Sequence, residues 1–479
     1  MQTQTRIVLG GISGVRKEFV AGRIKEVIAR NRAFGAQTLN QRVKILSAEG
    51  GVTDTRKFLS ASPSKQKSLL RQSYWEALHA LRLPEYKAAE VLLIPTHFTF
   101  VHFDRAFSPL SWPVAADGSG SASLLLDFLR KLRPTFIVNL IDDIHFIQHR
   151  IRKGPSEIEL QLREIIKWRD FETLAADFSA NEIIRSKPPL NGFVADQYER
   201  SPLFATQHDA ETLYRYIFSP NLPRVYASFP ISRVRRERKE EIRDGLIEEA
   251  NEFVAALSSR FTTFNPVTVD EVPLHLLYKE ITESTQHENP PEWVDFPILQ
   301  RWPIPTNGKL SPPLPPENLK IRLRDLEDVS QVVDDLGMLV DEQHSETVGR
   351  SMIARQVVPR DLRMIDQSDC VAIYRPKSPP EKNWSRGVRA EYNYARSCSD
   401  NHRPFMKIYI VTDKLNDGQL WEESTRGEVT TFEHESQNVT VIDSVGDLHK
   451  PENRKEALEN LVDAIEADSS RLTYRRRTE

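Results

Sequence analysis

Residues 359–411 contain, in order, PRDLRMIDQSD (359–369), CVAIYRP (370–376), SRGVRAEYNYARS (385–397) and RPFMKIYIV (403–411). CVAIY and MKIYIV are short apolar runs rich in β-branched residues, which is typical of buried strands. The segment between them, in which Gly387 opens a helix-like pattern, is predicted to be helical. A strand, a loop, a helix and a second strand in this order form the βαβ element of an open parallel sheet.

The polar residues of this stretch are expected at the functional edge of that sheet. In open α/β sheets the ligand crevice lies at the carboxyl ends of the strands. We expect Asp361, Asp369, Ser385 and Glu391 near that edge. The loop before the helix would bring Ser385 and backbone N–H groups toward a ligand, and a helix N-terminus favours an anion.

The pattern Ser385-x-Gly387-Val388-x-x-Glu391 resembles a motif of the nucleoside 2-deoxyribosyltransferase-like superfamily. Its closer match is the nucleoside 5′-monophosphate N-hydrolase branch. The transferase form of the motif usually begins with Asp and has Thr after the Gly, so Ser385 and Val388 depart from it. The resemblance covers about half of the chain, and it implies a flavodoxin-like α/β domain with glycosidase chemistry.

The resemblance also implies roles for individual residues. Cleavage of an N-glycosidic bond develops oxocarbenium character on the sugar, so a carboxylate on the far side of the anomeric carbon can attack or stabilise it. The resemblance gives this role to Glu391, with Tyr226 orienting it and Asp361 assisting the leaving base or the ribose. Ser385 and the N–H groups near Gly387 would hold a 5′-phosphate. This chemistry requires no cofactor.

Each of these residues could also have a role in the fold alone, without a part in binding or catalysis. An Asp directly before a strand, such as Asp369, is often a turn residue that bonds its own backbone. Glu391 on its own reads as a surface residue of a helix, but its spacing from Gly387 and Asp361 favours the catalytic interpretation. Arg233 follows the strand that contains Tyr226, where Arg can pair with a 5′-phosphate. The run RRERKEE that begins at residue 235 alternates in charge like an exposed helix, so both interpretations of Arg233 stay open.

The N-terminal half begins with a second recognisable unit, the strand RIVLGGI (6–12) followed by a glycine turn and a helix. This is the layout of a phosphate-binding loop. Gly11, Gly14 and Lys17 sit where G-x-x-x-x-G-K would place its first Gly, a middle Gly and the Lys. Arg16 replaces the last Gly, and its Cβ is expected to open the loop. Glu18 replaces the Ser or Thr that would bind Mg²⁺.

The following segments resemble the P-loop nucleoside monophosphate kinases, especially the archaeal adenylate kinase type, over residues 1–215. AEVLLIPTHFTF (89–100) supplies a buried strand and the Thr-His pair of that family, and TFIVNLIDD (135–143) supplies a third strand. The resemblance implies ATP as a ligand of Gly11, Gly14 and Lys17. Three interpretations remain for this half: an active kinase or ATPase, a nucleotide-binding sensor, or a decayed scaffold.

No metal site is predicted. His145 and His149 are four residues apart on a predicted helix, which permits a shared ligand. A solvated helix face beside Arg150 and Arg152 is the favoured interpretation.

The length of 479 residues predicts more than one core. We expect an α/β chain with two three-layer parallel-sheet domains. The predicted divisions are a P-loop kinase-like domain at 1–219, a deoxyribosyltransferase-like domain at 220–450 and a C-terminal helix with a basic tail at 451–479. A proline-rich insertion at 289–316 is expected to cover a surface without forming packed strands.

The composition bears on whether the chain binds nucleic acid or a membrane, and on its cellular compartment. A net charge of −3 over the whole chain gives no indication of nucleic-acid binding. The sequence contains no run of 18 apolar residues, so no membrane span is predicted. Two cysteines, Cys370 and Cys398, suggest a reducing compartment, so a cytoplasmic location is expected. Glycosidases of the resembled type commonly complete their pocket across a dimer, which implies a homodimer.

Taken together, the two halves predict an enzyme that cleaves the N-glycosidic bond of a nucleotide and carries a kinase-like nucleotide-binding domain. The alternatives are a non-catalytic nucleotide sensor or scaffold and a P-loop kinase or ATPase. The sequence does not choose the base or the sugar, nor between hydrolysis and transfer.

Overall fold

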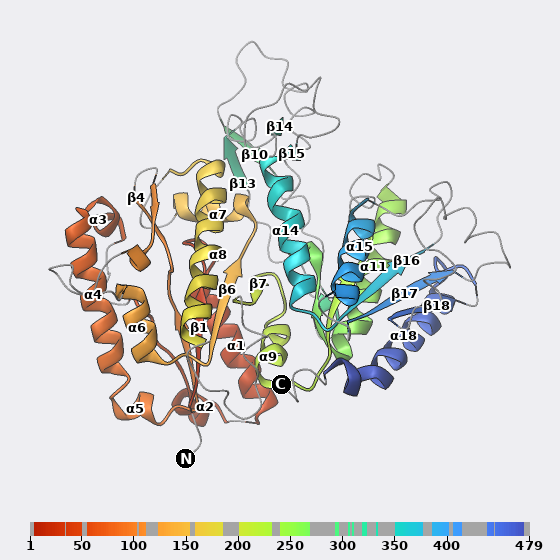
Figure 1. Cartoon of the computed structure of the whole chain (residues 1–479), viewed down its shortest axis with the longest axis horizontal. Coiled ribbons are helices and arrows are strands. Elements are labelled where there is room, and N and C mark those ends of the chain that lie inside the picture. The colour runs from red at the N-terminus through yellow and green to blue at the C-terminus, as the bar shows by residue number, and fades with distance from the viewer. Residues whose placement is uncertain are drawn as a thin grey trace, which may run out of the picture. The chain divides into compact units, whose positions relative to one another are not determined.

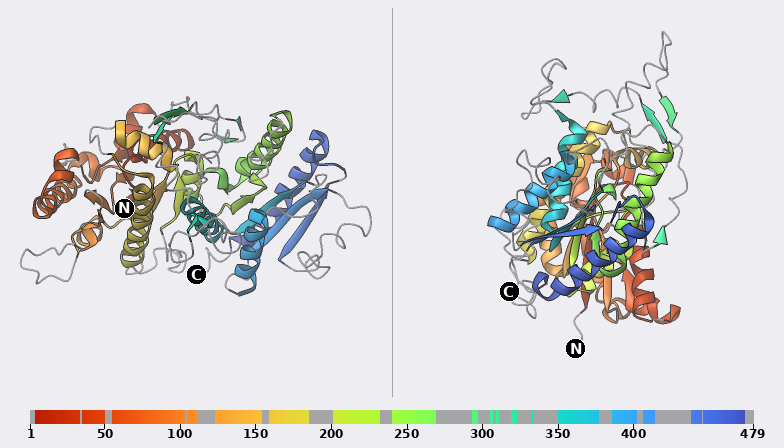
Figure 2. Two further views of the ribbon diagram at one scale, coloured as in Figure 1. Left: turned by 90° about the horizontal axis from the view of Figure 1, so that it is seen from above. Right: turned by 90° about the vertical axis from the view of Figure 1, so that its right-hand side faces the viewer.

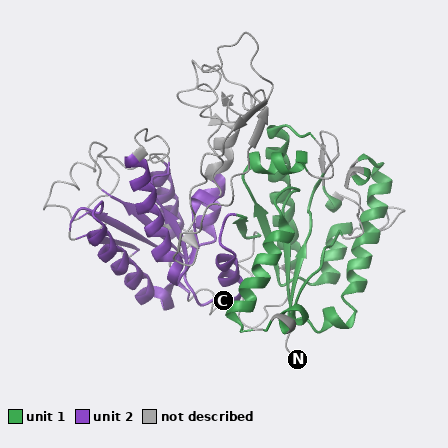
Figure 3. Ribbon diagram, turned by 180° about the vertical axis from the view of Figure 1, so that it is seen from behind, with its two compact units in different colours: residues 1–206, 269–299, 315–358 green, residues 207–268, 300–314, 359–479 purple. Residues whose placement is uncertain are grey.

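The structure, a computed structural model, describes residues 4–33, 35–49, 55–102, 105–111, 123–153, 159–184, 201–231, 240–268, 293–296, 305–306, 309–310, 319–322, 332–333, 350–376, 386–401, 406–413, 438–444 and 446–473. The chain forms two compact units, which Figure 3 colours separately. Unit 1 comprises residues 1–206, 269–299 and 315–358, and unit 2 comprises residues 207–268, 300–314 and 359–479.

Unit 1 is built on a five-stranded sheet in the order β2-β3-β1-β6-β7, with every neighbouring pair parallel (Figure 1). Its strands are β1 (Thr5–Gly10), β2 (Val43–Ile45), β3 (Val91–Pro95), β6 (Phe136–Ile141) and β7 (Leu203–Ala205). Parallel sheets are covered on both faces, so their central strands are apolar throughout rather than alternating. β3 and β6 follow this rule, since every residue in both is buried.

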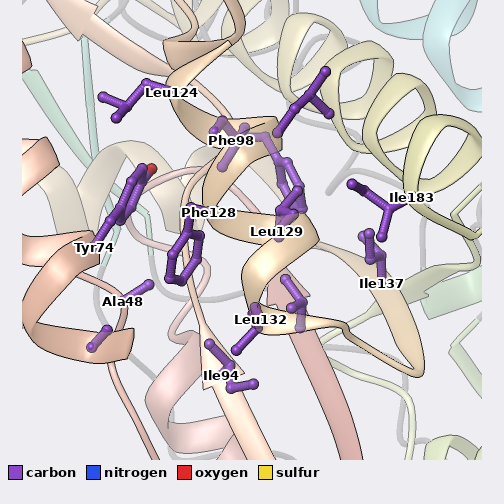
Figure 4. Packing of buried hydrophobic residues seen from close by; sticks show 14 of the residues in the cluster. Ala48, Tyr74, Ile94, Phe98, Leu124, Phe128, Leu129, Leu132, Ile137 and Ile183 are labelled. Atoms are coloured by element: carbon purple, nitrogen blue, oxygen red, sulfur yellow. The ribbon is translucent and has the colours of Figure 1, made fainter. Parts of the chain in front are cut away.

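The helices of unit 1 cover both faces of this sheet. Its helices are α1 (Lys17–Asn31), α2 (Ala36–Arg42), α3 (Thr55–Ser60), α4 (Pro63–Ala80), α5 (Pro84–Lys87), α6 (Leu124–Leu132), α7 (Ile144–Lys153) and α8 (Leu162–Ile184), with a 3₁₀ turn at Pro109–Ser111. Val8, Leu92 and Ile94 face one core with α4, α6 and α8 (Figure 4). In that core the rings of Tyr74 and Phe128 stack, with centroids 4.4 Å apart. Within the described residues, no helix is both long and apolar enough to cross a bilayer.

Within the described residues, four short antiparallel ladders accompany the two sheets. They pair β4 (Phe100–His102) with β5 (Arg105–Phe107), β10 (Trp293–Phe296) with β13 (Leu319–Arg322), β11 (Pro305–Thr306) with β12 (Lys309–Leu310), and β14 (Val332–Val333) with β15 (Arg350–Ser351). The proline-rich segment 289–316 therefore contains short strands. Pro305 is the first residue of β11, a position that proline tolerates because it needs no ladder donor there. The predicted role of this segment as a surface cover lies outside the described residues.

Unit 2 has a second five-stranded parallel sheet, in the order β18-β17-β16-β8-β9. Its strands are β8 (Arg224–Ser228), β9 (Thr262–Phe264), β16 (Cys370–Arg375), β17 (Lys407–Asp413) and β18 (Val439–Ser444). Counted along the chain, this is the order 2-1-3-4-5 of flavodoxin-like sheets, whose winding reverses between the first and third strands. Those strands are β8 and β16. The prediction of an α/β chain with two parallel-sheet domains is confirmed.

Helices cover both faces of the unit 2 sheet (Figure 2). They are α9 (Ala210–Phe218), α11 (Glu240–Arg260), α15 (Arg386–Asn401) and α18 (Pro451–Leu472), with a 3₁₀ turn at Pro266–Thr268. α14 (Met352–Asp366) belongs to unit 2 from Pro359 onward. Val225, Ala227 and Phe229 share a core with α11 and α18. Because side chains alternate along a strand, Tyr226 and Ser228 face the opposite side. Contacts of α15 with β16 and β17 place that helix on the sheet as well.

The division between the units falls earlier than the sequence placed it. The predicted boundary after residue 219 leaves α9 in the first domain, whereas the structure groups α9 with unit 2. Arg215 of α9 donates to the carbonyl oxygens of Ser258 and Phe261 at 2.6 and 3.1 Å. Tyr216 packs edge-to-face against Phe264 of β9. These contacts explain why α9 belongs to the second core.

A buried polar network ties α11 to α18 on one face of the unit 2 sheet. Glu249 accepts hydrogen bonds from Tyr374 Oη at 3.3 Å and from His449 Nδ1 at 2.7 Å. Arg454 lies 3.6 Å from the same carboxylate and also pairs with Glu252. The hydrogen bond to Glu249 raises the pKa of His449 against the opposing effect of burial.

We predict that this histidine makes the stability of the chain pH-dependent. Because the folded state holds the proton of His449 more tightly than the unfolded state, its contribution is complete below the ordinary histidine pKa of about 6.5 and disappears as pH rises through the raised pKa. His449→Gln should therefore be less stable than the wild type at acidic pH and nearly equal at alkaline pH. Urea unfolding across pH 5.5–9 measures this. Glu249→Gln should remove the same component, and a pH-independent loss in His449→Gln would contradict the assignment.

Candidate functional sites

The central feature of unit 2 is the junction of β8 and β16, where the winding of the sheet reverses. Ser228 is the last residue of β8 and pairs in register with Ile373 of β16. Ligands of open α/β sheets bind outside the carboxyl ends of the strands at such a point. Any functional side chain that reaches Ser228 is therefore in the expected crevice.

Glu391 is the side chain that reaches this point. It lies in the second turn of α15, and it is buried, with 8% of its surface exposed. Ser228 donates its hydroxyl hydrogen to Glu391 Oε2. The interpretation of Glu391 as an exposed helix residue is therefore wrong. A buried carboxylate is costly unless it is hydrogen-bonded, so the Ser228 hydroxyl helps to hold the charge in this place.

Two other predicted residues lie on the same side of the sheet as Glu391. Tyr226 is fully buried in β8, two residues before Ser228, so both side chains leave the strand on the face toward α15. Asp361 is half-buried in α14, three and four residues before Met364 and Ile365, which are fully buried. That spacing puts Asp361 on the sheet-facing side of its helix.

A hydrogen bond joins the two helices that carry these acids. Tyr394 of α15 donates to Asp366 Oδ1 of α14 at 2.7 Å. Burial, followed by the hydrogen bond to Asp366, raises the pKa of the Tyr394 hydroxyl. Tyr394 therefore stays protonated and acts as a fixed clamp between α14 and α15.

Asp369 is not at the predicted edge. It directly precedes β16, so it lies at the amino end of that strand, where its carboxylate accepts the backbone N–H of Arg224 at 2.7 Å. In return, the Asp369 N–H donates to the Arg224 carbonyl oxygen. Asp369 thus fixes the register of β8 against β16 at the edge opposite to Ser228. A residue that precedes a parallel strand cannot reach the crevice beyond the strand's far end.

Gly387 is the remaining predicted residue of unit 2 that the structure describes. Gly387 is exposed in the first turn, and a Cβ built there meets no other atom within 4 Å. The backbone at Gly387 is therefore open to a ligand. Ser385 and Arg233 lie outside the described residues.

Ser228 is the residue that sequence reasoning missed. The signal was present, because Tyr226 was already a candidate and a strand places residues two apart on the same face. The sequence does not show which helix this strand face contacts, because Ser228 and its partner Glu391 are 163 positions apart.

We predict a larger stability cost for Ser228→Ala than for an ordinary buried serine. The substitution removes a donor from a buried carboxylate, which costs about 1.5–3 kcal/mol. Ser368→Ala is the matched control, since the buried Ser368 hydroxyl donates to the neutral carbonyl oxygen of Met364 at 2.7 Å, and loss of such a bond costs about 1 kcal/mol. Urea unfolding of both variants measures the difference. Equal costs would show that the Ser228 bond to Glu391 is not charge-assisted.

The loop between β1 and α1 is the candidate site of unit 1. Gly11 and Gly14 have φ angles of +144° and +85°, and Arg16 has a φ of 63°. A Cβ at Gly11 would lie 2.7 Å from the Leu140 carbonyl oxygen, so glycine is required there. Arg16 does not open the loop, contrary to the expectation from its Cβ. It adopts the left-handed conformation instead, which L-residues reach at a cost of about 1–2 kcal/mol.

Lys17 is turned into this loop. Its side chain is 4% exposed, and Nζ donates to the Gly11 carbonyl oxygen at 2.7 Å. Nζ also lies 2.8 Å from Nε2 of His97, the residue that follows β3 and Thr96. Burial lowers the pKa of Lys17, although three nearby carboxylates oppose that shift. Lys17 is thus a buried, hydrogen-bonded amine at the carboxyl edge of the sheet.

Two carboxylates complete this cluster. Glu49 accepts from the Thr96 hydroxyl at 2.7 Å and lies 3.1 Å from His97 Nδ1. Burial raises the pKa of Glu49, but His97 and then Lys17 outweigh it and hold that pKa below its ordinary value. Ser13 Oγ lies 3.2 Å from His97 Nε2, so the ring links the loop to Glu49.

Glu172 of α8 holds the base of the loop. Its Oε1 accepts the backbone N–H groups of Gly11 at 2.9 Å and Phe98 at 3.0 Å, and its Oε2 accepts the Thr99 hydroxyl. Trp168 donates to Thr99 at 2.9 Å. Neither Glu172 nor Glu49 was a candidate from the sequence, because both are brought to the loop by the fold alone.

His145 and His149 do not form a solvated face, so that expectation is wrong. They are 1% and 5% exposed, on a helix that is buried around most of its circumference. Arg150 of the same helix donates to the Gly14 carbonyl oxygen at 2.8 Å and pairs with Asp142 at 2.6 Å. α7 therefore packs against the loop between β1 and α1. Among the residues that the structure describes, no group of three or more His, Cys, Asp or Glu side chains could hold a metal ion.

Comparison with known proteins adds little to this picture. No protein-family model matches the chain, and no curated protein matches it. A solved structure described as "Crystal structure of APE1195" aligns with 46% of this chain and 95% of its own, at 15% identity and a TM-score of 0.22. A match of that quality carries no argument about function, so the function has to be inferred from the two sites.

We predict that Arg16→Gly stabilises the protein. Glycine adopts the left-handed conformation without strain, so the free energy of unfolding should rise by about 1 kcal/mol. Arg16→Ala is the control, since it keeps the strain and removes only the stacking of the guanidinium over Phe19, whose ring centroid is 4.8 Å away. Thermal unfolding of the two variants compares them. A gain in both variants, or in neither, would show that the backbone at residue 16 is not strained.

Proposed function

We propose that unit 2 cleaves the N-glycosidic bond of a nucleotide, with Glu391 as the nucleophile. The observation that carries this proposal is the position of Glu391, a buried carboxylate that accepts a hydrogen bond from the last residue of β8 at the reversal point of the sheet. Burial and a fixed donor hold the carboxylate in one orientation. Preorganised charge of this kind is what stabilises a cationic transition state.

The proposed reaction follows the retaining glycosidase scheme. Glu391 attacks C1′ as the C1′–N bond breaks, and the bonding electron pair leaves with the base, which takes a proton from Asp361 or from water. Water or a second acceptor then displaces Glu391 from C1′ and restores the carboxylate. Ser228 and Tyr226, on the same strand face, keep the attacking oxygen aimed at the sugar.

The first turn of α15 would receive the 5′-phosphate. Gly387 leaves its backbone open, and the N-terminus of a 16-residue helix carries a partial positive charge that favours an anion. Glu391 lies one helical turn farther along the same helix. The distance from the start of the helix to Glu391 would thus match the distance from the phosphate to C1′ in a ribose phosphate. Ser385 and Arg233 are proposed as further phosphate contacts.

Unit 1 is proposed to bind a nucleotide rather than to transfer its phosphate. The left-handed residues of the loop and the buried Lys17 are the features by which such loops hold phosphate. Phosphoryl transfer needs Mg²⁺ beside them, and Glu18 puts an exposed carboxylate where its hydroxyl ligand would stand. ATP is the proposed ligand, bound without a role for Mg²⁺.

We predict base release by the wild type and none by Glu391→Gln. The full chain is incubated with a panel of ribo- and deoxyribonucleoside monophosphates and NAD, and free base is measured by liquid chromatography. Loss of the nucleophile should lower the rate by about 10³-fold or more, since covalent catalysis is removed. Glu459→Gln, an exposed acid on α18 of the same unit, is the control and should keep full activity.

Two outcomes would contradict the proposal. Base release that persists in Glu391→Gln would assign the chemistry to another residue. No release from any nucleotide, combined with nucleotide binding by calorimetry, would favour a non-catalytic sensor. Thermal unfolding of Glu391→Gln shows whether the variant is folded when it is tested.

A further inference from the structure

Helix α8 of unit 1 exposes apolar side chains that a monomer has no reason to expose. On its inner side, α8 packs Ala175, Ala176 and Ile183 into the core beside α6. On its outer side, Phe171, Leu174 and Phe178 are 38%, 65% and 50% exposed. Single exposed apolar residues are normal, but three on one helix with this spacing form a continuous stripe.

The charged residues of α8 extend that stripe at both ends. Arg163 and Lys167 are exposed before the apolar residues, and Glu182 is exposed after them. At 100° per residue, these three and the three apolar residues fall within an arc of about 100° on the helix surface. Two other acids lie nearby: the half-exposed Glu164 accepts the Gln161 N–H at 2.6 Å at the start of the helix, and the exposed Asp170 lies about 20° outside the arc that the stripe covers. The stripe is therefore basic at its N-terminal end, apolar in the centre and acidic at its C-terminal end.

This arrangement is complementary to itself when reversed. Arg163 mirrors Glu182, Lys167 mirrors Phe178, and Phe171 mirrors Leu174, all about the midpoint between Glu172 and Thr173. A second α8 laid antiparallel across that midpoint would place opposite charges together at both ends and apolar side chains together in the middle. A two-fold interface requires this property, since the same patch serves both partners.

We propose that two copies of this chain associate through antiparallel contact of their α8 helices. The partner is a second copy because the charge pattern is satisfied by its own reversal, with Arg163 of each copy meeting the acidic end of the other. Glu182 is available for this contact, since its pair with Arg130 is 3.8 Å long and both side chains are nearly half exposed. The Lys167 ammonium would lie beside the Phe178 ring, a favourable cation–π pair. The inference does not depend on the chemistry proposed for unit 2.

The test is the oligomeric state of the full chain by sedimentation velocity from about 1 to 100 µM, a range that detects a weak or moderate dimer. We expect a concentration-dependent dimer that Leu174→Glu dissociates by about 100-fold or more, because it buries a charge in the apolar centre. Trp75→Glu is the control, since Trp75 is an equally exposed apolar residue on α4, outside the stripe. It should leave the dimer unchanged.

A charge exchange separates this interface from any other. Arg163→Glu alone and Glu182→Arg alone should each weaken the dimer by about tenfold, and the two together should restore it, because every pair regains opposite charges. A chain that stays monomeric over the whole range overturns the proposal. So does a dimer that Leu174→Glu leaves intact, or a double variant as weak as the single ones.

Discussion

The hydrogen bond from Ser228 to Glu391 depends on where the parallel sheet of unit 2 reverses its winding. The chain leaves β8 and β16 in opposite directions, so a crevice opens beyond their carboxyl ends. Ser228 is the last residue of β8, and the alternation of side chains turns it toward the face that α15 covers. A carboxylate placed there is withdrawn from water and still has a donor. The topology thus places a buried acid close to the start of α15.

The two faces of the same sheet carry polar groups of different kinds. On the α11 and α18 face, Glu249 is satisfied by Tyr374, His449 and Arg454, and the network joins elements about 200 residues apart. Such a closed network stabilises packing, because every charge has a partner of opposite sign. On the other face, Glu391 accepts the hydroxyl hydrogen of Ser228, a neutral donor, at the point where the winding of the sheet reverses. In unit 1, Glu172 accepts backbone N–H groups and Lys17 donates to a backbone carbonyl oxygen, so both of these buried groups are hydrogen-bonded.

The sequence was informative where local patterns decide structure. The apolar runs around residues 370 and 407 predicted buried parallel strands, and the segment that Gly387 opens was predicted to be a helix, which is α15. Ser228 and Glu172 could not be identified, since each acts through a contact between segments that only the fold brings together. Asp369 was misplaced although its position before β16 already fixes it at the amino edge. Arg16 was misjudged because the loop accepts backbone strain rather than opening.

The central claim is that Glu391 faces C1′ of a nucleotide whose phosphate lies at the start of α15. A crystal structure of Glu391→Gln with a bound nucleoside monophosphate tests this most directly. The account predicts the phosphate at the Gly387 backbone and the residue 391 side chain within about 3.5 Å of C1′, on the side opposite the base. A nucleotide bound elsewhere, or one whose C1′ faces away from residue 391, would contradict it.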